Sequence, residues 1–180
     1  MYKENVEWLK NAKELMKDYP VCDSFMSDYS HKEKEVFIYE LTSFRIIMNS
    51  INNNIDDIDF ISGLLDSSND SDITIMGLEE INNRKNNILD YCSMVDNFYL
   101  KDNIINFYNS LKDDCNKVIE ENSKHICTFA YNNSYVQRIN EEKRKLKDIN
   151  SSLLILSGKG PEIIIDYTDK INNSKKLVLK

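Results

Sequence analysis

Glycine and proline are scarce in this chain of 180 residues, which contains four glycines and two prolines. Folds built mainly from β-strands need many tight turns, and these two residue types form most of them. The scarcity therefore indicates a helical protein. Hydrophobic residues make up 41% of the chain and charged residues 29%, which is typical of a globular protein rather than a disordered one.

Long apolar runs are also missing. The longest, such as Leu153–Leu156, extend for only a few residues, whereas a membrane-spanning helix needs about 20. The charged start of the chain, Met1 to Asn5, lacks the apolar stretch of an export signal. We therefore expect a cytoplasmic protein with no membrane partner.

Basic residues are outnumbered, with 23 Lys and Arg against 30 Asp and Glu, for a net charge of -7. A surface that binds nucleic acid through its phosphates is basic, so this balance argues against a nucleic-acid partner. The chain has four cysteines in no paired spacing and two histidines. We therefore expect reduced thiols rather than disulfides or a zinc site.

Apolar residues recur at helical spacing through most of the chain. The clearest stripe has intervals of four, three, four and three residues and consists of Phe37, Leu41, Phe44, Met48 and Ile51. The same intervals return between Ile104 and Val118. The patterns predict helices over approximately 4–18, 31–51, 56–65, 76–94, 101–129 and 134–149, the fifth either continuous or broken near Asn122.

Two local signals set the expected ends of the second helix. Ser30, with Glu33 three residues later, matches a capping box at its start. A run of asparagines, 52–54, follows its last apolar residue, and Asp56 stands where it can cap a further helix. We therefore expect one helix to end near Ile51 and another to begin at Asp56.

The last thirty residues change in character. Leu153–Leu156 and Glu162–Tyr167 are rich in β-forming residues and flank a segment with two glycines and a proline, which is typical of a hairpin. The expected fold is an all-α bundle of six to seven helices with a small C-terminal β-hairpin. Residues 1–150 would form the helical domain, and residues 151–180 the hairpin and a basic tail.

The carboxylates Asp56, Asp57 and Asp59 are the candidate ligands of a divalent metal. An EF-hand loop that starts at Asn52 needs glycine at position 57 and a bidentate glutamate at position 63, and the chain has neither. We therefore expect at most weak, unspecific binding of a divalent ion, and no resident cofactor.

No catalytic residues are predicted. His125 and Cys127 are two positions apart, and that spacing on a helix points two side chains away from each other. Gly158-Lys159-Gly160 lacks the Ser or Thr that follows the lysine of a phosphate-binding loop. We therefore expect no enzymatic activity, and a function through binding another protein.

The segment from Ile51 to Asp59 resembles the signature of the tellurite-resistance TerB-like family, in which an apolar helix precedes Asp-Gly-x-Ile-x-x-x-Glu. Asn52, Asn53, Ile55 and Asp59 occupy the Asp, Gly, Ile and Glu places, and the match covers residues 36–65. Of the carboxylates that the family links to metal, one is replaced by Asn52 and the other is kept only in the shorter form of Asp59. The resemblance implies an all-α bundle and a cytoplasmic, non-enzymatic accessory protein linked to stress or defence.

Viral Bcl-2-like proteins are an alternative, because they too are helical, of similar length and often rich in Asn and Ile. Such proteins hold a partner helix in a groove between their own helices. No motif of that family is present in this sequence, so the alternative depends on gross features alone. It implies a virus- or phage-encoded inhibitor of a host defence protein.

Overall fold

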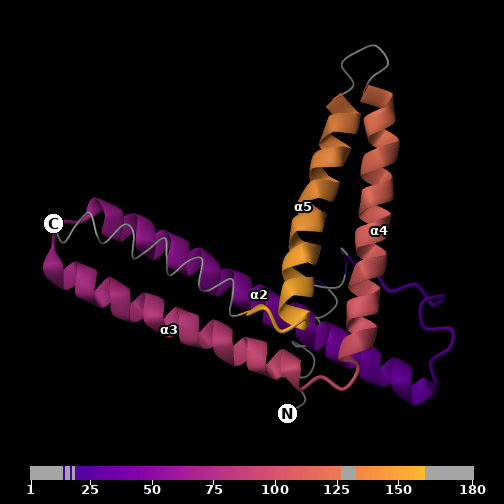
Figure 1. Ribbon diagram of the computed structural model, residues 1–180, viewed down its shortest axis with the longest axis horizontal. Helices are drawn as coiled ribbons and strands as arrows, with labels where there is room; N and C mark the ends of the chain where they lie inside the picture. Colours follow the sequence, from indigo (N-terminus) through magenta and orange to yellow (C-terminus); the bar gives the residue numbers. More distant parts are fainter. Residues whose placement is uncertain (1–13, 15–16, 18, 127–132, 161–180) are drawn as a thin grey trace.

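The described residues of the computed structural model, 14, 17, 19–126 and 133–160, contain four helices (Figure 1). They are α2 (His31–Ser67), α3 (Ser71–Asp96), α4 (Lys101–Ile126) and α5 (Asn133–Leu156). Helices α2 and α3 form one antiparallel hairpin. Helices α4 and α5 form a second, which leaves the first at a steep angle (Figure 1). None of these four helices has the length of apolar sequence that crossing a membrane requires.

Helix α2 starts where the sequence predicts. The Ser30 side chain accepts a hydrogen bond from the backbone N–H of Glu33 at 3.2 Å, and the Glu33 carboxylate accepts one from the backbone N–H of Ser30 at 2.8 Å. The two bonds satisfy amides that have no partner within the helix. The predicted capping box is therefore confirmed.

The predicted break after Ile51 is wrong, because α2 continues without interruption for 37 residues. The buried Asn54 explains why the asparagines do not end it. Its amide nitrogen donates to the Ser50 carbonyl at 2.7 Å, and its amide oxygen accepts from Asn87 of α3 at 3.3 Å. Ile58, seven residues beyond Ile51, continues the buried side of the helix. The neighbouring helix thus turns a polar run into part of the hairpin contact.

The number of helices and the C-terminal hairpin were also predicted wrongly. The described residues contain four helices rather than six or seven, because two predicted helices form the single α2. Leu153–Leu156 is the last turn of α5 and not a strand. Ile149, Ser152 and Leu156 are fully buried at helical spacing, which keeps this stretch helical beyond residue 150 and as far as Leu156.

Gly158 ends α5 rather than turning a β-hairpin. Its φ is +78°, a conformation that glycine adopts without steric cost, and the backbone N–H of Lys159 donates to the Leu154 carbonyl at 2.9 Å. The second predicted strand, Glu162–Tyr167, and the basic tail lie outside the described residues, as does most of the predicted helix 4–18.

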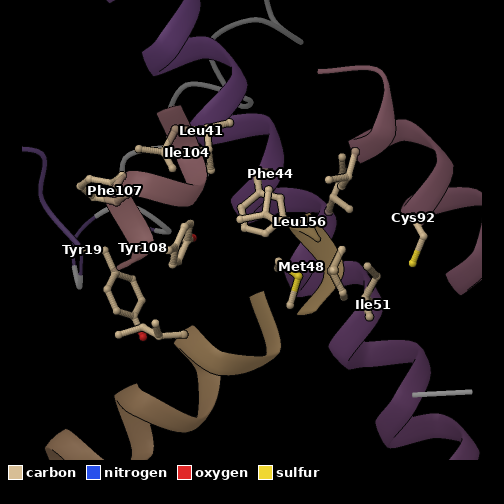
Figure 2. Close-up of a cluster of buried hydrophobic side chains, with 14 of the residues drawn as sticks. Tyr19, Leu41, Phe44, Met48, Ile51, Cys92, Ile104, Phe107, Tyr108 and Leu156 are labelled. Atoms are coloured by element: carbon tan, nitrogen blue, oxygen red, sulfur yellow. The ribbon is translucent and has the colours of Figure 1, made fainter. Parts of the chain in front are cut away.

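The hydrophobic core lies where the two hairpins meet (Figure 2). Aromatic rings dominate it, and the edge of one ring meets the face of the next. Phe44 of α2 lies 5.4 Å from Tyr108 of α4, and Phe107 lies 5.5 Å from Phe25, with interplanar angles of 77° and 74°. Past Ile51 on α2 and before Ile88 on α3, the buried hydrophobic residues are Ile58 and Ile81. Among the described residues, α2 and α3 alone form this far part of the first hairpin, which we call the arm.

A buried carboxylate fixes the start of α4. Glu40 of α2 accepts hydrogen bonds from the backbone N–H groups of Tyr99 and Leu100, at 2.9 and 3.2 Å. These amides precede the first residue of α4, where a negative charge is also favoured by the helix dipole. The side chain of one hairpin therefore sets the position at which the other begins.

Candidate functional site

The three predicted metal ligands lie on one uninterrupted stretch of α2 and not in a loop. Asp56 and Asp59 are exposed, and Asp57 is partly buried against α3. Within the residues that the structure describes, no group of three or more His, Cys, Asp or Glu side chains is placed to hold a metal ion. Weak metal binding stays a prediction. The test is the melting temperature with and without calcium or magnesium, in the wild type and in Asp59→Asn.

Asp57 has a different partner, Arg84 of α3. The guanidinium contacts the Asp57 carboxylate at 3.1 Å and the Glu80 carboxylate at 2.9 Å. These side chains are between one third and one half exposed, so the ion pairs contribute little to stability. They are informative about geometry. The contact of Asp57 with Arg84 shows that the flank of α2 with Asp57 and the flank of α3 with Arg84 lie on the same side of the hairpin.

A polar cluster lies at the meeting point of the two hairpins. Arg45 of α2 donates to the Asp148 carboxylate of α5 at 3.2 Å and to the Tyr108 hydroxyl of α4 at 3.0 Å. The Tyr19 hydroxyl also donates to Asp148, at 2.9 Å, and the Arg45 guanidinium lies 4.5 Å from the centre of the Tyr19 ring. The cluster joins three helices and a preceding segment through one partly buried charge pair.

The pKa values in this cluster move away from reactive ranges. Burial raises the pKa of Tyr108 to about 12, although Arg45 opposes the rise. The pKa of Tyr19 is raised by burial and by the neighbouring Asp148. Burial would lower the pKa of Arg45, but Tyr108 and Asp148 outweigh it and raise that pKa. Both phenols therefore stay protonated at neutral pH, and the cluster is suited to holding helices together rather than to proton transfer.

The cysteines and the second histidine do not form a nucleophilic site. Burial raises the pKa of Cys115 to about 11 and also raises the pKa of Cys92, so neither thiol ionises at neutral pH. His125 is exposed near the end of α4, where its ring stacks on Tyr135 of α5 with centroids 5.0 Å apart. Cys127 lies outside the described residues.

The end of the first hairpin at which α2 connects to α3 carries exposed apolar side chains. Phe60 and Leu64 of α2 are 68% and 50% exposed, and Ile73 and Met76 of α3 are 51% and 70% exposed. We call these four residues the distal face. Single exposed apolar residues are common on proteins, whereas several together at one place are typical of a binding surface.

Helical geometry places the distal face on one side of the hairpin. Asp57, Phe60 and Leu64 are spaced three and four residues apart on α2, so they share a flank. Ile73, Met76, Glu80 and Arg84 share a flank of α3 in the same way. The ion pair of Asp57 with Arg84 joins these two flanks, so the four apolar residues lie on the same side.

The surroundings of the distal face are acidic. Residues 52–83 contain no Lys, Arg or His. The acidic residues in that range are Asp56, Asp57, Asp59, Asp66, Asp70, Asp72, Glu79 and Glu80. Asp70 is used locally, since it caps α3 by accepting from the backbone N–H of Asp72 at 2.9 Å. Asp56 and Glu79 are exposed and lie one helical turn from Phe60 and Met76 respectively.

The sequence alone does not point to this face, because Phe60 and Leu64 belong to an apolar run with Ile61 and Leu65 of the kind that usually forms a core. The spacing of the apolar residues nevertheless distinguishes Phe60 and Leu64 from the residues that face α3. The side of α2 facing α3 is set by Asn54, Ile58, Ile61 and Leu65, which repeat at four, three and four residues. Phe60 and Leu64 belong to a second row beside it.

Comparison with protein-family models, with curated proteins and with solved structures finds no significant match to this chain. The segment that resembles the TerB-like signature forms part of the continuous α2. It therefore does not form the turn between helices that the motif suggests.

Proposed function

We propose that this protein acts by binding another protein, as an accessory or regulatory factor and not as an enzyme. The observation that carries the proposal is the distal face, where four large apolar side chains are half exposed or more. Removing such side chains from water on binding is favourable by about 25 cal/mol per Å² of apolar area. The connected ends of α2 and α3, which carry these residues, lie far from the place where the two hairpins meet (Figure 1).

The buried polar groups support a binding role rather than a catalytic one. Arg45 donates to Tyr108 and to Asp148 at the junction of the hairpins, and these interactions hold the helices together. The raised pKa of Cys115 leaves that thiol protonated. Catalytic groups are usually tuned the other way, with pKa values close to the working pH.

The biological setting is the less defined part of the proposal. The resemblance of residues 36–65 to the TerB-like signature favours an accessory role in stress or defence. Inhibition of a host defence protein by a virus- or phage-encoded chain would use the same kind of surface. The identity of the bound protein separates the two roles.

The test is capture of partners from lysate with three forms of the tagged chain. The wild type is compared with Phe60→Ser/Met76→Ser, which removes the two most exposed side chains of the face. The matched control is Val136→Ser, which changes an exposed apolar residue of α5. A stoichiometric partner that is retained by the wild type and the control but lost from the double variant would support the proposal. Equal retention by all three would contradict it.

A further inference from the structure

We propose that the distal face binds a basic amphipathic helix of a partner protein, which packs across the exposed flanks of α2 and α3. This inference rests on the proposed function and specifies the chemistry of the partner. It combines the apolar side chains of the face, their arrangement in two rows and the sign of the charge around them.

The two rows of the face suit a helix. Phe60 and Leu64 are one turn apart on α2, and Ile73 and Met76 are one turn apart on α3. Two antiparallel helices that lie side by side present such rows as ridges, and the side chains of a third helix fit between them.

The charge around the face selects the partner. Asp56 and Glu79 border it, and residues 52–83 carry acidic side chains and no basic ones. Arg84, at the edge of the face, is paired with Asp57 and Glu80, so Asp56 and Glu79 are the acids left to meet a partner. A helix with an apolar stripe flanked by Lys or Arg would place its cations against these acids. Charge complementarity of this kind raises the association rate and disfavours partners of the wrong sign.

The same charge argues against other occupants. Anionic lipid surfaces and nucleic-acid phosphates would be repelled by an acidic border. A second copy of this chain that used the same face would bring acid against acid, which is unfavourable for a symmetric contact. A basic helix meets both the apolar and the acidic parts of the surface.

The experiment uses the whole chain with methyl-labelled Ile, Leu and Met, and two model peptides. One is an 18-residue amphipathic helix of Leu and Lys, and the other has Gln in place of every Lys. We expect the Lys peptide to shift the methyl signals of Leu64, Ile73 and Met76. We expect the Gln peptide to bind at least roughly tenfold more weakly. Each charge pair at a rim contributes modestly, but this peptide loses all of them together.

Variants separate apolar from charge contributions. Phe60→Ser/Met76→Ser keeps every charge and should weaken the Lys peptide at least about tenfold, because two buried anchors are lost. Asp56→Asn/Glu79→Gln keeps every apolar side chain and should weaken binding of the Lys peptide roughly threefold. Val136→Ser should bind as the wild type does.

Four results would overturn the inference. Equal binding of the Lys and Gln peptides would remove the charge selection and leave the proposed function standing. Equal binding of the Lys peptide by Phe60→Ser/Met76→Ser would show attraction to the acidic protein without use of the face. The absence of binding by either peptide would reject a helical occupant, while partner capture still tests the proposed function. A dimer of the free chain that the same double variant abolishes would assign the face to a second copy.

Discussion

Asp148 illustrates how single residues join distant parts of this chain. Its carboxylate accepts hydrogen bonds from Tyr19 and from both terminal nitrogens of Arg45, and these partners lie 129 and 103 positions away in the sequence. A charge pair of this kind is costly to desolvate and becomes favourable only when both partners are present. The cluster therefore contributes more to the choice of one arrangement of the hairpins than a surface ion pair does.

Removal of Arg45 should destabilise the fold much more than removal of Arg84. The Arg45 and Asp148 side chains are 12% and 26% exposed, whereas Arg84 and Asp57 are 35% and 49% exposed. We expect Arg45→Ala to lower the free energy of unfolding by about 2 kcal/mol or more, since Asp148 is left without its cation. Arg84→Ala should cost less than about 1 kcal/mol. Urea denaturation of the two variants checks this, and equal losses would contradict it.

Alkaline pH should destabilise the protein through Tyr108. The pKa of this phenol rises from 10.0 to about 12 on folding because of burial, so the folded state holds the proton more tightly. The stabilising contribution is complete below pH 10 and is lost as the pH rises from 10 to 12. We expect the free energy of unfolding of Tyr108→Phe to fall less steeply than that of the wild type over this range, with a total difference of about 2 kcal/mol.

The measurement is the urea midpoint at intervals between pH 8 and pH 12. Tyr99→Phe is the matched control, because the Tyr99 side chain is 87% exposed. Its profile should follow that of the wild type. A Tyr108→Phe profile as steep as both others would show that this phenol does not titrate with unfolding.

At the scale of the element, helix α2 shows what the sequence could and could not predict. The stripe from Phe37 to Ile51 and the capping box at Ser30 are local signals, and both predicted the structure correctly. The continuation through 52–54 depends on Asn87, which lies 33 positions beyond Asn54. A contact across two helices is not visible in local spacing, so local turn preference gave the wrong answer.

The same limit applies to the C-terminal end and to the site. Leu153–Leu156 has the composition of a strand, and burial against the other hairpin keeps it helical. Phe60 and Leu64 have the composition of a core, and they are exposed because they lie beside the row of α2 residues that faces α3. Composition predicted a helical chain, but it could not distinguish a compact bundle from two hairpins that meet at one end.

A proline in the asparagine run tests the continuity of α2. Asn53 is exposed in the middle of the helix, where proline removes a backbone hydrogen bond and clashes with the preceding turn. We expect Asn53→Pro to lower the free energy of unfolding by about 3 kcal/mol. Asn53→Ala should be neutral or slightly stabilising, because alanine is the better helix former. A tolerated proline would indicate a turn at this position, as the sequence first suggested.

At the scale of the whole molecule, the core and the proposed binding face lie in different regions. The junction contains the aromatic core and the Arg45–Asp148 pair. The distal part of α2 and α3 has few buried apolar residues and carries the proposed binding face. An arm of this design exposes apolar side chains away from the core, and the proposed partner helix would cover them.

Amide hydrogen exchange should therefore vary along α2 even though the helix is continuous. Local opening needs less free energy where few apolar contacts are broken. We expect amides between Phe44 and Ile51 to exchange at least about tenfold more slowly than those between Phe60 and Ser67, a difference of about 1.4 kcal/mol in opening. Binding of the basic peptide should slow exchange in the second range and leave the first unchanged. Uniform exchange along α2 would mean that the hairpin opens as one unit with the junction, and the separation of stability from binding would then be wrong.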